Sequence, residues 1–138
     1  MIQLVAGTAE NCRIAAPLLD KGLVRQKVED KYPLEWCLAE IQSNRAQLWM
    51  AWEHGKITGA VMTIINTYPS GLKYLDIFLL GGWKFHKWAM DGYNAIKDFA
   101  LSQGCVTLAA GGRSGWSKVV KKYEPEARTD SLIAINLR

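Results

Sequence analysis

The sequence has few cysteines, and this shortage restricts the kinds of site it can build. Cys12, Cys37 and Cys105 lie far apart, form no CxxC pair and have no histidine at metal-ligand spacing. An odd, sparse set of this kind argues against a disulfide framework and against a zinc site. We therefore predict no metal site, and we expect all three thiols to be buried as small apolar groups.

Long hydrophobic runs are also missing. No apolar segment approaches the roughly 20 residues of a membrane span, and the first eight residues lack the charged and apolar regions of a signal peptide. Internal repeats, linkers and low-complexity segments are absent too. We expect a single domain over residues 1–138, a cytoplasmic location and no membrane partner.

What the sequence does have is an ordinary globular composition with an uneven charge. Its 138 residues are 49% hydrophobic and 22% charged, with a net charge of +4. Residues 1–69 hold 7 basic and 7 acidic residues, whereas residues 70–138 hold 10 and 6. The whole excess lies in the second half, where a positive field suits CoA, a nucleotide or a nucleic acid.

Hydrophobic periodicity predicts an alternation of strands and helices. Strands are expected at residues 2–5, 48–52, 57–68, 74–80, 105–110 and 131–137, and helices at 8–24, 34–41, 85–100 and 116–123. The second to fourth strands are joined by short turns and form an antiparallel meander. The fourth strand, the helix that ends before Gly104 and the next strand form a βαβ unit with parallel strands. The fold class is α/β (α+β), with a mixed central sheet and flanking helices.

The most informative segment joins the fourth strand to its helix. Residues 74–80 end in Gly81 and Gly82, which we interpret as a turn, and the amphipathic pattern begins at Phe85. A helix start of this kind presents backbone N–H groups and a positive dipole to an anion. Lys84 and Lys87 add charge at the same place, so this segment is expected to bind a phosphate-bearing ligand. The alternative is a tight turn with solvated lysines.

This order of elements resembles the GNAT superfamily of acyl-CoA-dependent N-acyltransferases. The resemblance covers nearly the whole chain and is best over residues 54–60 and 75–123. In the family, a loop written Arg/Gln-x-x-Gly-x-Gly/Ala binds the CoA pyrophosphate at a helix start. The resemblance implies the GNAT-like fold, acetyl-CoA or another acyl-CoA as cofactor, and transfer of the acyl group to a primary amine of a small molecule or protein.

Carried over to this chain, the loop places Lys84 at the Arg/Gln position, Lys87 at the middle glycine and Ala89 at the last small residue. The implied cofactor-binding residues are Leu80, Gly81, Gly82, Lys84, Lys87, Trp88 and Ala89. Lys87 is a departure, because a glycine there lets the backbone approach the pyrophosphate.

Two further departures concern the C-terminal part. Many members carry a tyrosine in the last helix that protonates the leaving thiolate, and Val120 takes that position here. Only one strand is evident after Tyr123, where the family has two. Residues 111–118 resemble small phage-encoded members, which implies a phage virion or host protein as an alternative partner and the virion as an alternative location.

Acyl transfer needs a base for the amine and donors for the thioester oxygen. The resemblance places the donor on a backbone N–H of the strand at residues 75–80. Asp76 is the only carboxylate in that strand and is the first candidate base; the alternative is a solvated residue on a sheet edge. His86 is the second candidate, with a solvated loop histidine as its alternative. Glu53 and His54 are interpreted as turn residues.

A second glycine-rich loop, at residues 111–115, follows the next parallel strand. Ligands of open α/β sheets bind beyond the carboxyl ends of strands, so Arg113 and Trp116 are candidate substrate-binding residues. Arg113 would bind a carboxylate or phosphate of the acceptor, unless it is only a capping or surface residue.

Two other functions remain open. The departures at Lys87 and Val120 allow a catalytically inactive GNAT-fold protein, used as a virion component, adaptor or inhibitor. The alternation of lysines with aromatic rings at residues 84–88 also fits a nucleic-acid-binding or nucleobase-modifying protein.

Overall fold

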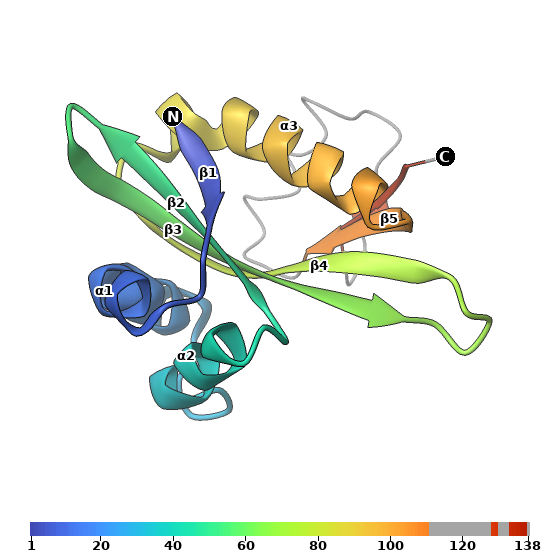
Figure 1. Cartoon of the computed structure of the whole chain (residues 1–138), viewed down its shortest axis with the longest axis horizontal. Helices are drawn as coiled ribbons and strands as arrows, with labels where there is room; N and C mark the ends of the chain where they lie inside the picture. The colour runs from blue at the N-terminus through green and yellow to red at the C-terminus, as the bar shows by residue number, and fades with distance from the viewer. Residues whose placement is uncertain (111–127, 130–132, 138) are drawn as a thin grey trace.

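The computed structural model describes residues 1–110, 128–129 and 133–137. Its strands form one mixed sheet in the order β1-β2-β3-β4-β5-β7-β6. Helices α1 and α2 cover one face of the sheet and α3 covers the other (Figure 1). The element bounds are β1 Ile2–Val5, α1 Ala9–Gln26, α2 Leu34–Gln42, β2 Gln47–Glu53, β3 Lys56–Thr67, β4 Lys73–Gly82, α3 Phe85–Ser102, β5 Cys105–Ala110, β6 Arg128–Thr129 and β7 Ile133–Asn136.

Over the described residues the topology is the predicted one, with a single correction, and the helix predicted at residues 116–123 lies outside them. Strands β1 to β4 are antiparallel neighbours, and β4 pairs in parallel with β5 across α3, so the meander and the βαβ unit are confirmed. Strand β7 pairs antiparallel with both β5 and β6. The prediction of one strand after Tyr123 is wrong, because the two residues of β6 add a second.

Local chemistry fixes the ends of α1. The hydroxyl of Thr8 accepts a hydrogen bond from the backbone N–H of Asn11, which caps the helix start. Pro17 lies inside the helix and does not start it. The helix ends where Lys27 takes a left-handed conformation with φ of 58°.

Two hydrophobic cores lie on either side of the sheet. The core beneath α1 and α2 includes Leu19, Ile41 and Met62, and the core beneath α3 includes Trp88 and Leu108. The cysteine prediction is confirmed, since Cys12, Cys37 and Cys105 are all buried and free. Burial raises the pKa of each thiol, that of Cys37 to about 11.

The interpretation of Gly81 and Gly82 as a turn is wrong. Strand β4 continues through both residues, which pair with Ala60 and Gly59 of β3. A Cβ atom on Gly81 would lie 1.9 Å from the carbonyl oxygen of Leu18, so this glycine allows α1 to pack directly on β4. The chain turns instead at Trp83 and Lys84, just before α3.

Candidate functional site

Strand β4 loses its parallel partner halfway along. Pairing with β5 runs from Lys73, opposite Cys105, to Ile77, opposite Ala110. Phe78 is an extra residue in the pairing with β3, because Thr63 pairs with Ile77 while Met62 pairs with Leu79. In the described part of the chain, residues 78–82 therefore have a strand beside them on the β3 side only, and their other backbone edge is available to a ligand.

This edge leads into the start of α3, where the expected phosphate-binding residues lie. Lys84 precedes the helix with a left-handed φ of 54°, and both Lys84 and Lys87 expose about half of their side chains. The first turn of a helix leaves N–H groups without intrahelical partners, which favours an anion. The geometry thus brings two lysines and a helix start to one end of β4.

The other expected cofactor residues have structural contacts of their own. Trp88 is buried, packs its ring over Gly59 and donates its indole N–H to the carbonyl of Trp83 at 3.0 Å. Ala89 is buried beside it, and Leu80 packs on the α3 core. The side chains of Trp88 and Ala89 therefore shape the segment, and it is their backbone that could contact a ligand.

Glu53 lies among the basic residues of this segment. Its carboxylate accepts a hydrogen bond from Nζ of Lys87 at 3.0 Å and lies 3.8 Å from Nζ of Lys84. His54 Nε2 is 3.7 Å away and adds an ion pair when protonated. The hydrogen bond from Lys87, followed by the charges of the neighbouring cations, lowers the pKa of Glu53. The carboxylate therefore balances part of the positive charge that a phosphate would meet.

The hairpin register brings Glu53 there. Glu53 pairs with Lys56 across a two-residue loop, in which His54 and Gly55 both have positive φ, as a type I′ turn requires. The same strand, β3, aligns Gly59 with Gly82 at the end of β4. Sequence reasoning treated Glu53 as a turn residue, although the meander itself places this turn beside the end of β4.

Asp76 occupies the middle of the sheet. It pairs with Ile64 of β3 and Ala109 of β5, so the alternative of a solvated edge residue is wrong. Burial raises the pKa of its carboxyl to about 6. Among the described residues, no hydrogen bond or ion pair reaches this carboxylate and no cation offsets the cost of its charge.

The two candidate bases lie in different places. His86 is exposed in the first turn of α3. Six residues of extended strand, about 20 Å at the usual rise, separate Asp76 from Gly82 at the other end of the site. A reacting atom near Asp76 is therefore out of reach of His86, which sits with the phosphate-binding end.

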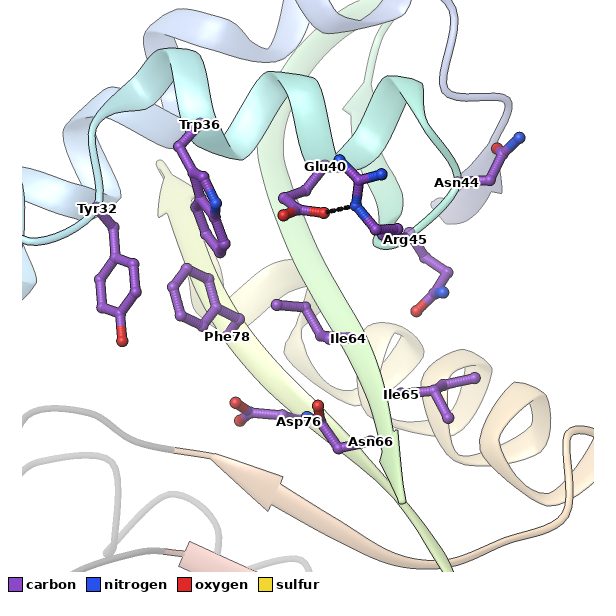
Figure 2. Close-up of a pocket in the computed structure, with 11 residues that line it drawn as sticks. Tyr32, Trp36, Glu40, Asn44, Arg45, Ile64, Ile65, Asn66, Asp76 and Phe78 are labelled. Atoms are coloured by element: carbon purple, nitrogen blue, oxygen red, sulfur yellow. Dashed lines mark hydrogen bonds and ion pairs between the residues drawn. The ribbon is translucent and has the colours of Figure 1, made fainter.

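Asp76 opens into a pocket of about 750 Å³ on the α2 side of the sheet (Figure 2). The lining residues are Tyr32, Trp36, Glu40, Asn44, Arg45, Gln47, Ile64, Ile65, Asn66, Asp76 and Phe78. Three rings form one wall, with Tyr32 and Phe78 edge to face at 4.8 Å and Trp36 5.8 Å from Phe78. Glu40 and Arg45 form an ion pair at the far side. Sequence reasoning did not identify this pocket.

Arg113 and Trp116, the expected substrate-binding residues, lie outside the described residues, as do Val120 and Tyr123. Over residues 1–110, 128–129 and 133–137, no cluster of three or more histidine, cysteine or acidic side chains is arranged to hold a metal ion. No helix within those same ranges has the length and apolar character needed to cross a membrane.

No protein-family model matches the chain, and no curated protein matches its sequence. Its structure is similar to solved structures. A predicted acetyltransferase of Clostridium acetobutylicum with acetyl-CoA aligns over 99% of this chain and 97% of its own, with a TM-score of 0.73 and 14% identity. The PaiA N-acetyltransferase of Thermoplasma acidophilum in complex with coenzyme A aligns over 99% of both chains, with a TM-score of 0.69 and 14% identity. The ribosomal-protein-alanine N-acetyltransferase of Brucella melitensis aligns over 94% and 93%, with a TM-score of 0.66 and 20% identity.

Proposed function

We propose that this chain, which has the GNAT fold, is an N-acyltransferase that moves an acetyl or other acyl group from acyl-CoA to a primary amine. The observation that carries the proposal is the free half of β4. Among the described residues, residues 78–82 have a strand on one backbone edge only, and they lead directly to a helix start flanked by Lys84 and Lys87. A long ligand with amides along its arm and phosphates at one end is complementary to this arrangement.

The residues present fit such a ligand. The open edge of β4 offers N–H and C=O groups to the amides of a pantetheine arm, as a neighbouring strand would. The start of α3, with Lys84 and Lys87, offers charge and N–H groups to a pyrophosphate. The roughly 20 Å of strand between Gly82 and Asp76 separates the phosphate end from the place where an acyl group would react.

The chemistry assigns distinct tasks to the chain. Acyl-CoA supplies an activated acyl thioester. Asp76, with its raised pKa and no cation beside it among the described residues, accepts a proton from the incoming ammonium, directly or through water. A backbone N–H of β4 donates to the thioester oxygen as negative charge develops on it. The amine nitrogen would bond to the acyl carbon as the C–S bond breaks, and the proton given up by the ammonium would return, through water, to the sulfur that leaves. His86 stays with the phosphate end, where it contacts a phosphate and does not act as the base.

One contact favours a second candidate function. Glu53 already occupies the lysines that would bind the pyrophosphate. A GNAT-fold protein that has lost its cofactor, and acts as an adaptor or inhibitor, would also have its lysines neutralised in this way.

Calorimetric titration with acetyl-CoA and with free CoA tests the proposal. We expect binding by the wild-type protein and its loss when Lys84→Glu and Lys87→Glu are combined. Lys73→Glu reverses a charge at the opposite end of β4 and is the matched control, which should bind as wild type does. Absence of binding by the folded wild-type protein would reject acyl transfer and leave the cofactor-free candidate.

A further inference from the structure

The pocket on the α2 side meets the open edge of β4 at one place. Asp76 lies one residue before the last pair between β4 and β5. Phe78 belongs to both features, because its ring lines the pocket and its backbone begins the open edge. A molecule in the pocket would therefore reach the point where an arm lying along β4 ends.

The aromatic wall of the pocket is accessible to solvent. Tyr32 and Trp36, at the start of α2, are 36% and 37% exposed, and Phe78 joins them from β4. Figure 2 shows the three rings gathered on one side of the pocket, with Asp76 below Phe78. A group of exposed rings offers a flat apolar surface that also attracts cations.

The charges in the pocket leave one carboxylate unmatched. Glu40 is mostly buried, and its carboxylate is paired with the guanidinium of Arg45. Asp76 has no cationic partner in the described residues. A ligand with one positive charge would balance Asp76. In a ligand with several positive charges, only one could pair with Asp76, because Glu40 is already paired with Arg45. An anionic ligand would be repelled by Asp76.

From this juxtaposition we propose that the pocket binds the acyl acceptor, and that the acceptor is a primary amine with one positive charge on a short chain and a flat apolar body. The ammonium lies at Asp76 and the apolar body lies against Tyr32, Trp36 and Phe78. The assignment of this amine as an acceptor rests on the proposed acyl transfer, whereas its binding to the pocket does not.

Titration with 2-phenylethylamine tests the binding, first with the protein alone and then with the protein saturated with CoA. Phenylacetate matches the ring but reverses the charge, and spermidine keeps amines but has several charges and no ring. We expect 2-phenylethylamine to bind and the other two to bind at least about 10-fold more weakly, the factor that one lost interaction of about 1.4 kcal/mol corresponds to.

Substitutions in the pocket test separately the aromatic contact with the apolar body and the charge contact with the ammonium. Trp36→Ala should weaken binding of 2-phenylethylamine by about 5- to 30-fold, a loss typical of a contact between an aromatic ring and an apolar group, and Trp36→Phe should restore most of it. Asp76→Asn should weaken binding at neutral pH. Tyr32→Ala should weaken it too, while Tyr68→Ala, an equally exposed tyrosine that lies outside the pocket, should not.

The outcomes for the pocket and for acyl transfer are distinguishable. Binding of CoA without binding of 2-phenylethylamine in either titration would overturn the acceptor proposal and leave acyl transfer standing. Binding of the amine without binding of CoA would support the pocket and reject the transferase. Equal or tighter binding of spermidine, or binding that Trp36→Ala leaves unchanged, would overturn the proposed acceptor class.

Discussion

The ammonium of Lys87 lies 3.0 Å from the carboxylate of Glu53, although 34 residues separate them in the sequence. The contact joins the start of α3 to the β2–β3 hairpin at the end of β4, where a pyrophosphate would bind. An anionic ligand and Glu53 therefore compete for the same lysine, and this competition makes the hairpin a determinant of ligand affinity.

Glu53→Gln should bind CoA more tightly than the wild-type protein. The change removes the negative charge that occupies Lys84 and Lys87, and the pairs are solvent-accessible, so the gain should be modest, about 2- to 5-fold. Calorimetry at low ionic strength measures it, and added salt should reduce the difference. Glu29→Gln, an exposed carboxylate elsewhere, is the control. An unchanged or weaker affinity of Glu53→Gln would show that the carboxylate does not compete with the ligand.

The rate of acyl transfer should depend on the ionisation of Asp76. Because its carboxyl has a pKa of about 6 and is active as a base only when ionised, kcat/KM should rise with pH through about 6 and then level off. Asp76→Asn should lower kcat by about 100-fold or more and should lose this rise. His86→Asn should retain the rise, since His86 lies at the phosphate end. If the rise of kcat/KM with pH persisted in Asp76→Asn, the base would be another group.

The same carboxyl should make folding stability fall as pH rises. Burial gives Asp76 a higher pKa in the folded protein than in the unfolded chain, so the folded state holds the proton more firmly. The ordinary pKa of aspartate is about 4, and below that pH the contribution to stability is fully present. It is lost as the pH rises from about 4 through about 6. We expect a loss of about 2 kcal/mol over this window.

Urea unfolding at about pH 4 and about pH 7 brackets this window and measures the effect. Asp76→Asn should remove most of the decrease and be more stable than wild type at the higher pH. Asp98→Asn removes an exposed carboxylate of α3 and should keep the wild-type dependence. A wild-type stability that rises across the window would mean that the Asp76 carboxylate has a stabilising partner.

The elements that the sequence predicted are those with a long, regular hydrophobic pattern. Helix α3 repeats its apolar positions over 18 residues, and the three meander strands are separated by recognisable turns. Strand β6 was missed because two residues, Arg128 and Thr129, are too short to show a period. The assignment of the fold needed only the order of these elements.

The site was less accessible to sequence reasoning, because its contacts join distant segments. The lysines of the α3 start and Asp76 were found from their local setting. The pairing of Glu53 with Lys87, and the gathering of Tyr32 and Trp36 against Phe78, depend on strand register and on how α2 lies on the sheet. Gly81 was misread for the same reason, since a glycine that admits a neighbouring helix looks like a glycine that makes a turn.

Gly81→Ala should destabilise the protein. The added Cβ would lie 1.9 Å from the carbonyl oxygen of Leu18 and 3.0 Å from its carbonyl carbon, so α1 must move away from β4. Both contacts are with backbone, which cannot rotate aside, and overpacking of this kind costs about 1–3 kcal/mol. Gly92→Ala in α3 is the control, because its Cβ would meet side chains alone, the end of Ile2 at 3.3 Å and the ring of Trp88 at 3.7 Å, and alanine favours the helix. Urea unfolding should therefore show a lower midpoint for Gly81→Ala and a change within about 1 kcal/mol for Gly92→Ala. If Gly81→Ala were as stable as wild type, the direct packing of α1 on β4 would not be what requires a glycine there.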